Sequence, residues 1–149
     1  MIPFEEIELG ERYETSTRTI FDADIVNFAG VSGDFNRLHL DDEFASRSYL
    51  GRRVAPGLLV TSVMSGLRSR LDDYAIAGWL HASRKFSAPV FVGDTLQGLY
   101  EVVELRASKS RPELGIVRLR VQTSVLGRGV VQEGEDVLAI ERRGVRPAP

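Results

Sequence analysis

An acidic side chain and a histidine lie close together in the segment 28–39, which reads FAGVSGDFNRLH. Asp34 and His39 are five residues apart, a spacing that puts side chains on opposite faces of a strand and about 140° apart around an α-helix. Only an irregular segment can bring them to one point, and Gly33 and Asn36 favour such a segment. A carboxylate and an imidazole that converge in one small space can move a proton to and from a water molecule.

The same residues fit a second interpretation. Asp34 and Asn36 are common in polar turns because their side chains bond their own backbone, and His39 would then be an ordinary surface residue. Short motifs often match by chance, so spacing alone favours the polar turn and leaves the acid–base pair as its alternative.

The elements around this segment are predicted to form a lid-like insertion. Residues 11–20 alternate loosely and predict a first strand. Asp22 is a candidate N-cap for a short helix that ends near Gly30 and has one apolar face. The residues of that face are Ile25, Val26, Phe28 and Ala29. Asp41 and Asp42 then open another helical turn, which stops before Gly51.

A further helix begins at Pro56-Gly57 and continues through Leu67. Every residue from Leu58 to Leu67 is apolar or small, so this helix is predicted to be buried without a solvent face. Pro56 suits a helix start because its missing N–H would have no partner there. Gly57 leaves its own N–H approachable at the positive end of the helix dipole, although the sequence by itself favours a plain helix-start glycine.

The rest of the chain predicts an antiparallel sheet. Four strand-length runs cover residues 79–86, 95–106, 115–126 and 130–142. The last run loses its alternation at 131–134, which indicates a bulge, and residues 144–149 read as a frayed tail. One apolar helix and about five strands that are apolar on one face form an α+β domain in which the sheet wraps the helix. We expect one domain over residues 1–149.

Composition excludes several functional classes. The 149 residues carry a formal net charge of −2 and no cysteine, so a nucleic-acid partner, disulfides and thiolate chemistry are not expected. Two histidines are too few for a convincing metal site, and we predict neither a metal nor a cofactor. No apolar run approaches the roughly 20 residues of a spanning helix, and no signal peptide opens the chain. These features predict a cytoplasmic protein without membrane partners.

The segment 28–45 resembles the hydratase signature of the MaoC-like dehydratases, the family that includes the (R)-specific enoyl-CoA hydratases. The positions that match the signature are Gly33, Asp34, Asn36, Leu38, His39 and Ala45. The resemblance continues through residues 54–66 and, more loosely, 86–94. One position departs, because Arg37 stands where the family usually has proline. The resemblance implies a hotdog fold and a hydratase or dehydratase that acts on enoyl thioesters.

Hydration of an enoyl thioester adds water at the β-carbon and a proton at the α-carbon, while negative charge builds on the thioester oxygen. The reaction therefore needs a base, an acid and donors for the oxyanion. Asp34 is the candidate base and His39 its partner, a pair that the resemblance also implies; which of them delivers the α-proton stays open. The N–H of Gly57 is the candidate oxyanion donor.

Three further residues are candidates for substrate binding or support. Asn36 can bond either the loop backbone or the thioester, and we favour the loop. Ser65 matches a serine that the family places near the catalytic pair, although helix–sheet packing explains a small residue there almost as well. With Arg37 in place of proline the loop is less rigid, and the long side chain of Arg37 could reach the phosphates of the substrate. The remaining basic pairs, Arg52-Arg53 and Arg84-Lys85, are predicted to be solvated, and Trp79 belongs to the core or to an interface.

The predicted partners are an acyl thioester, carried by coenzyme A or by an acyl carrier protein, and a second copy of the chain in a homodimer. Two alternatives compete with the hydratase. A hotdog thioesterase would need its acid or base on the central helix, where residues 58–67 hold no Asp, Glu or His. A non-catalytic acyl-binding subunit should lack Asp34 or His39, and this chain has both.

Overall fold

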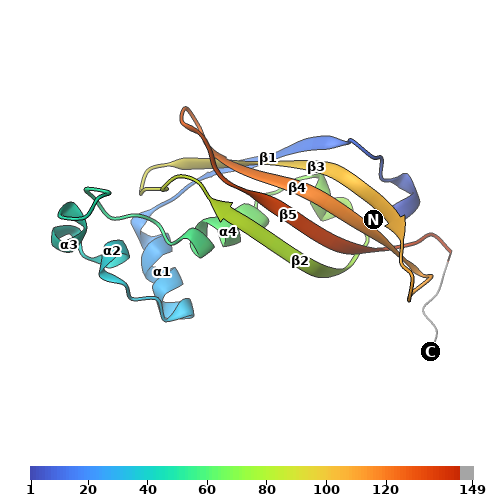
Figure 1. The fold of residues 1–149 in the computed structure, drawn as a ribbon, viewed down its shortest axis with the longest axis horizontal. Coiled ribbons are helices and arrows are strands. Elements are labelled where there is room, and N and C mark those ends of the chain that lie inside the picture. Colours follow the sequence, from blue (N-terminus) through green and yellow to red (C-terminus); the bar gives the residue numbers. More distant parts are fainter. Residues whose placement is uncertain (145–149) are drawn as a thin grey trace.

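The computed structural model describes residues 1–144 and places five antiparallel strands in one sheet (Figure 1). Most of the predicted tail, residues 145–149, lies outside the described residues. In chain order the elements are η1 (Phe4–Glu6), β1 (Arg12–Thr19), α1 (Asp22–Ser32), α2 (Arg37–Leu40), α3 (Asp42–Ser46), α4 (Gly57–Ser65), η2 (Arg70–Asp73), β2 (Ile76–Phe86), β3 (Thr95–Ala107), β4 (Leu114–Val125) and β5 (Gly129–Glu141).

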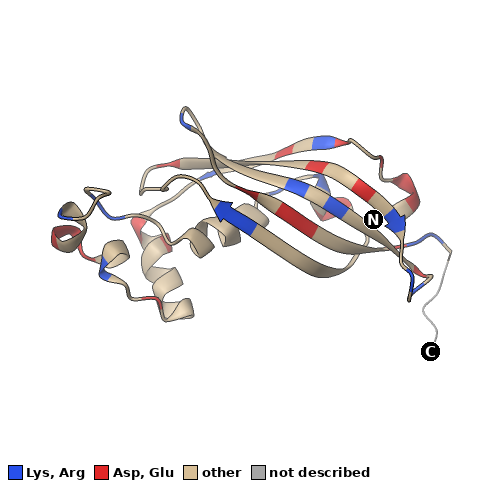
Figure 2. Cartoon of the chain, in the orientation of Figure 1, with Lys and Arg blue, Asp and Glu red and all other residues tan. Residues whose placement is uncertain are grey.

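The sheet has the strand order β1-β3-β4-β5-β2, so β1 and β2 are its edges. Side chains alternate along β4 as predicted: Val117, Leu119 and Val121 are buried, and Arg118 and Arg120 point to the opposite face. The outward face carries both signs of charge across β3, β4 and β5 (Figure 2). Its charged side chains pair across the strands, which is typical of a sheet with one face in water.

Helix α4 packs on the other face of the sheet and supplies much of the core. Its buried residues are Leu59, Val60, Val63 and Met64, and full burial of each side chain of this size stabilises the fold by about 1.5–3 kcal/mol. Met64 can approach β3 closely because Gly98 has no side chain; a Cβ there would lie 2.0 Å from Met64 Cε. An antiparallel sheet wrapped around a central apolar helix is the hotdog fold that the sequence predicts.

One face of α4 is nevertheless open to solvent, so the prediction of a fully buried helix is wrong. Leu58 is 64% exposed, and Ser62 and Ser65 are also exposed. The sheet of a single chain covers only one side of the helix. Both serine hydroxyls donate to carbonyl oxygens of the helix itself, Ser62 to Leu58 and Ser65 to Ser62, each at 2.8 Å.

Helices α1, α2 and α3 form a helical lobe at one end of the sheet, next to α4 (Figure 1). Helix α1 runs to Ser32, slightly beyond the predicted end at Gly30. Asp22 is not its cap: the carboxylate of Asp24, three residues into the helix, accepts the N–H of Phe21 at 2.9 Å. Among residues 1–144, no helix has the length and apolar character needed to span a membrane.

The predicted bulge in the last strand is confirmed. The register of β4 and β5 shifts between Thr123, which faces Gln132, and Ser124, which faces Val130, so Val131 is the extra residue. As a result Val131 and Gln132 are both buried, although neighbouring residues of a regular strand point to opposite faces.

Candidate active site

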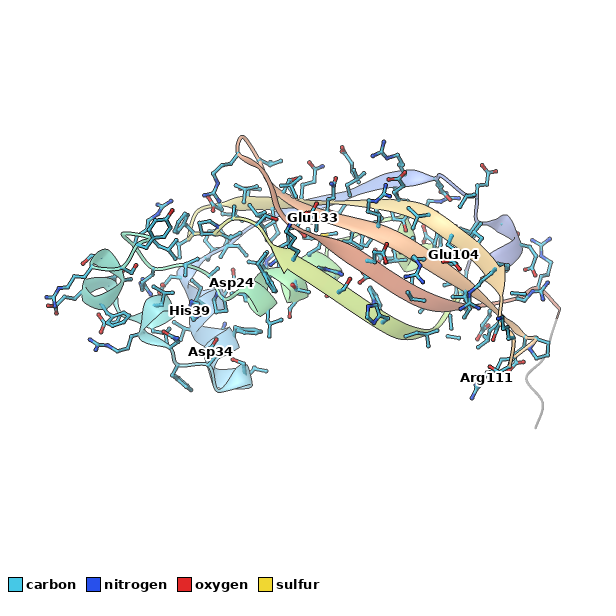
Figure 3. The ribbon with its side chains drawn as sticks, in the orientation of Figure 1. Asp24, Asp34, His39, Glu104, Arg111 and Glu133 are labelled. Atoms are coloured by element: carbon cyan, nitrogen blue, oxygen red, sulfur yellow. The ribbon has the colours of Figure 1, made fainter. Side chains whose placement is uncertain are left out.

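The structure brings Asp34 and His39 together. Oδ2 of Asp34 lies 3.7 Å from Nε2 of His39, in the helical lobe beside the start of α4 (Figure 3). Helix α1 ends where Gly33 adopts a left-handed conformation, with φ of 76°, and the chain turns back toward α2. The predicted irregular segment covers residues 33–36, and His39 itself lies in the short helix α2.

Local hydrogen bonds orient the Asp34 side chain. The backbone N–H of Asp34 donates to Oγ of Ser32 at 3.1 Å, and the Oδ1 of Asp34 accepts the N–H of Asn36 at 3.3 Å. Asn36 in turn caps α2, because its Oδ1 accepts the N–H of Leu38 at 2.9 Å. Oδ2 of Asp34 thus stays available on the side of His39. The turn that the second interpretation proposed is real, and it positions the acid.

The His39 ring is oriented from a distant part of the chain. Its Nδ1 lies 2.7 Å from the carbonyl oxygen of Val54. A carbonyl oxygen can only accept, so Nδ1 carries the hydrogen and, in the neutral ring, Nε2 keeps its lone pair toward Asp34. The His39 side chain is 14% exposed and that of Asp34 is 45% exposed. The pair therefore has one end in the protein and the other in solvent.

His39 and Gly57 line the same cavity, which has a volume of about 640 Å³. Its wall is mostly apolar and comes from the segment before α4, the start of α4, the end of β2 and the loop after it. The other lining residues are Leu50, Val54, Ala55, Leu58, Val60, Phe86, Ser87, Ala88, Pro89, Val90 and Gln132. Within the described chain no acceptor is bonded to the N–H of Gly57, at the first residue of the helix. His39 and the start of α4 thus share an apolar pocket, and Asp34, which does not line it, lies next to His39.

Ser65 does not join this arrangement. It lies eight residues beyond Gly57 on α4, about 12 Å along the helix axis, and it does not line the cavity. Its hydroxyl is bonded to the Ser62 carbonyl. In this chain Ser65 contributes to the exposed face of α4.

Two polar features of the interior were missed. Gln132, 2% exposed, reaches the cavity from β5. Arg84 was predicted to be solvated, but its side chain is 6% exposed and forms a two-pronged pair with the fully buried Asp136, at 2.6 and 2.8 Å. The irregular run at 131–134 was the available signal for Gln132. For Arg84 no local signal exists, because its partner lies on another strand.

Residues 5–125 match the family described as the MaoC like domain. The chain belongs to the MaoC-like dehydratase family. A 3-hydroxybutyryl-CoA dehydratase of Methylorubrum extorquens is 33% identical over 141 residues, covering 94% of this chain and 85% of that protein. An (R)-specific enoyl-CoA hydratase of Rhodospirillum rubrum is 34% identical, covering 95% and 93%. The X-ray structure of a monoamine oxidase regulatory protein from Archaeoglobus fulgidus superposes with a TM-score of 0.86 at 29% identity, over 95% of each chain.

Arg37 is where this MaoC-like chain departs from the signature, and the structure shows what replaces the proline. Arg37 is the first residue of α2, a position at which proline is favourable. Its guanidinium donates twice to Oδ2 of Asp41, from Nε at 3.0 Å and Nη2 at 2.9 Å, and lies over the ring of Phe44. The N–H of Phe44 and the Arg37 guanidinium hold the pKa of Asp41 below its usual value. Arg37 thus links α2 to the start of α3.

Proposed function

We propose that this protein is a hydratase or dehydratase that adds water to the double bond of an enoyl thioester and removes it in reverse. The observation that carries the proposal is the Asp34–His39 pair, 3.7 Å apart, whose histidine lines a cavity that Gly57 also lines. The family and the names of its relatives support the same reaction.

The geometry of the pair suits the activation of a water molecule. An ionised Asp34 and a neutral His39 present two acceptors that face each other at 3.7 Å, beyond direct hydrogen-bond distance. One water can donate a hydrogen to each of them, which leaves an oxygen lone pair free to attack the β-carbon. Either acceptor can take the proton as the carbon–oxygen bond forms. In dehydration the same groups return that proton to the departing hydroxyl.

The thioester lies, in this proposal, with its carbonyl oxygen at the N–H of Gly57. Addition of water makes that oxygen an enolate, and a fixed N–H at the positive end of α4 stabilises the developing charge. The proton that reaches the α-carbon comes from the Asp34–His39 pair. The base, the acid and the oxyanion donor are thereby all provided by residues 34–57.

The acyl group occupies the apolar cavity, where Leu50, Val60 and Phe86 are among the walls. The relatives are named for coenzyme A substrates, which favours a coenzyme A thioester, such as a trans-2-enoyl-CoA and its (R)-3-hydroxyacyl product, over a carrier-protein thioester. Arg37 is not assigned to the phosphates, because its guanidinium is bonded to Asp41.

The proposal is tested by incubating the purified protein with enoyl-CoA thioesters of increasing chain length and with their 3-hydroxyacyl-CoA counterparts. We expect loss of the ultraviolet absorbance of the conjugated thioester, with (R)-3-hydroxyacyl-CoA as the product. Release of free coenzyme A without hydration would instead support a thioesterase. Binding without either reaction would support the acyl-binding subunit.

We also propose that the protein is a homodimer that forms at the β2 edge. Among residues 1–144, strand β2 pairs only with β5, and it exposes Ile76, Trp79, Leu80 and Phe86. The other edge, β1, carries Arg12, Glu14 and Arg18 and is interrupted by a register shift, features that protect an edge from pairing. The exposure of Trp79 excludes the core and favours the interface that the sequence offered as its alternative. One domain and a cytoplasmic location stay predictions.

A further inference from the structure

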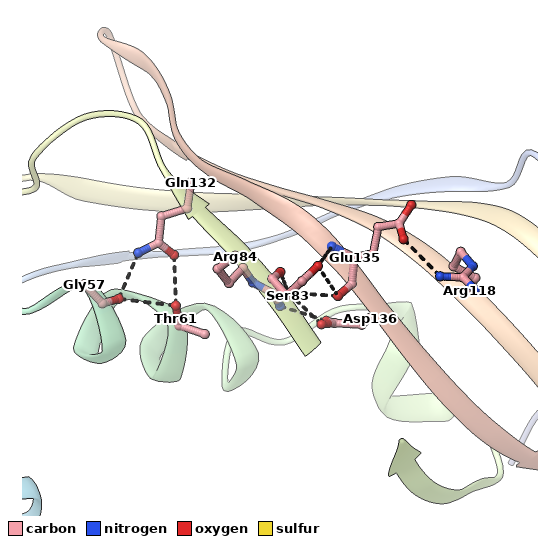
Figure 4. A network of polar contacts seen from close by, with 8 residues as sticks. All are labelled: Gly57, Thr61, Ser83, Arg84, Arg118, Gln132, Glu135 and Asp136. Atoms are coloured by element: carbon pink, nitrogen blue, oxygen red, sulfur yellow. Dashed lines mark hydrogen bonds and ion pairs between the residues drawn. The ribbon is translucent and has the colours of Figure 1, made fainter. Parts of the chain in front are cut away.

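Gln132 is a buried amide that joins the sheet to the first turn of α4 inside the cavity (Figure 4). Its Nε2 donates to the carbonyl oxygen of Gly57 at 2.8 Å, and its Oε1 accepts from the hydroxyl of Thr61 at 3.1 Å. The other contacts of α4 with the sheet are apolar and therefore not directional, as those of Val60, Val63 and Met64 illustrate. The amide fixes both the position and the rotation of the helix start.

The orientation of this amide is determined by its partners. The Gly57 carbonyl can only accept, so the nitrogen of the amide must face it and the oxygen must face Thr61. A glycine has more backbone freedom than any other residue, and the first residue of a helix lacks an intrahelical partner for its N–H. Gln132 removes part of that freedom by holding the Gly57 carbonyl.

The bulge at Val131 makes this contact possible. By inserting one residue into β5 it directs Gln132 toward α4. The Val131 carbonyl meanwhile accepts the N–H groups of Ser87 and Ala88, at 2.9 and 3.3 Å, and these two residues also line the cavity. Two successive residues of β5 thus bond two segments that line the cavity, the start of α4 and the loop after β2.

We infer that Gln132 is a positioning residue for the reaction: it holds Gly57 so that the glycine N–H is already in place when charge develops on the thioester oxygen. The inference rests on the proposed function for the role of Gly57. Gln132 touches no reacting atom, and it acts through the start of α4. Preorganised donors are effective because they need no rearrangement during the reaction.

The first test compares Gln132→Met with Gln122→Met, which removes an amide from the outward face of neighbouring β4. We expect Gln132→Met to lower kcat by roughly 10-fold or more. This loss should be smaller than the loss of about 10²–10³-fold that is typical of removing an oxyanion donor outright. KM should change little because the apolar walls remain, and Gln122→Met should behave like the native protein. A lower melting temperature with unchanged kcat per folded molecule would show a purely structural Gln132 and overturn the inference.

The second test uses Gln132→Glu and the pH. A protonated carboxyl can donate to the Gly57 carbonyl and accept from Thr61, whereas a carboxylate repels that carbonyl. Burial raises the pKa of such a carboxyl, so the variant should work at low pH and fail as the pH rises. The groups facing this position are His39 in the cavity and the Arg84–Asp136 pair on the same face of the sheet. At each pH the kcat of the variant is divided by the kcat of the native protein, which removes the titration that both proteins share. This ratio should fall as the pH rises, and a ratio that does not change with pH would contradict the inference.

A third measurement is independent of activity. The amide of Thr61 bonds the Gly57 carbonyl within the first turn of α4, so its hydrogen exchange reports on that turn. Gln132→Met should speed exchange at Thr61 about tenfold relative to Gln122→Met. If the native protein hydrates no enoyl thioester, the proposed function fails while this measurement still decides whether Gln132 holds the helix start. Unchanged exchange at Thr61 would refute the positioning role by itself.

Discussion

The chemistry of the site depends on the orientation of a few side chains as well as on their residue types. Asp34 receives its orientation from its neighbours Ser32 and Asn36, and the sequence contains that information. His39 receives its orientation from the Val54 carbonyl, fifteen residues away. The resemblance to the family signature therefore predicts that the two groups converge, but neither it nor the spacing predicts which ring nitrogen faces the acid.

Gly57 allows a direct prediction at this scale. A Cβ on Gly57 would lie 2.7 Å from Cε1 of Phe86, whose ring lines the cavity. Gly57→Ala should push that ring into the substrate pocket and displace the oxyanion donor, so kcat should fall by roughly 10–100-fold, less than complete removal of a donor. Melting temperature and turnover per folded molecule should be measured on the same samples.

The matched control for that variant is the double substitution Gly57→Ala with Phe86→Leu. If the Phe86 ring transmits the effect, the smaller side chain should restore much of the lost turnover. If the double variant is no better than Gly57→Ala, the methyl group itself disturbs the donor. Full activity in Gly57→Ala alone would move the oxyanion role to another backbone N–H.

At the scale of elements, α2 and α3 are too short to be stable alone and depend on their caps and links. Asn36 and Asp41 cap the two helices. Arg53 connects the start of α1 to the start of α3 through Asp22 and Asp42, at 2.8 and 2.7 Å. Polar contacts therefore assemble the lobe that holds His39. From the sequence, only the capping residues among these contacts could be predicted.

The link between α2 and α3 predicts how Arg37 and Asp41 behave. Arg37→Ala should leave KM for an enoyl-CoA unchanged, because Arg37 bonds Asp41 and not the substrate. Asp41→Asn should lower the melting temperature at pH 6. The pKa of Asp41 is lowered in the folded protein, so its stabilisation is complete above about pH 3.8 and is lost as the pH falls below that value. The difference in melting temperature between the native protein and Asp41→Asn should therefore vanish in acid.

A rise in KM for Arg37→Ala would return Arg37 to the substrate phosphates. A difference between the native protein and Asp41→Asn that persists at low pH would show that the side-chain amide, and not the lost charge, causes the change. Thermal unfolding at several pH values and steady-state kinetics at one pH decide both points.

At the scale of the whole molecule, the sequence was sufficient for the hotdog architecture. Its strands alternate, and the one long apolar segment could only be covered by their apolar faces. What it could not predict is which side of α4 the sheet leaves open. Leu58, Ser62 and Ser65 look like core residues in sequence, since a small or apolar side chain is compatible with the core and with an interface. The buried Arg84–Asp136 pair was hidden for a related reason, because only the strand order brings β2 and β5 together.

The open edge predicts the oligomeric state. Leu80→Glu places a charge on the exposed β2 strand and should convert the dimer to a monomer in sedimentation experiments. The single tryptophan, Trp79, lies on the same strand, so its fluorescence should shift to longer wavelength on dissociation. The equivalent change on the other edge, Thr17→Glu in β1, is the control and should leave the dimer intact. An active native monomer would contradict the proposal.

The central claim is that Asp34 and His39 together activate water. Its most direct test is the turnover of a trans-2-enoyl-CoA by Asp34→Asn and His39→Ala, with folding verified by circular dichroism. Each variant should lose about 10²–10⁴-fold in kcat, the range of a positioned proton-transfer group, while remaining folded. Near-native turnover by either folded variant, on a substrate that the native protein hydrates, would contradict the account.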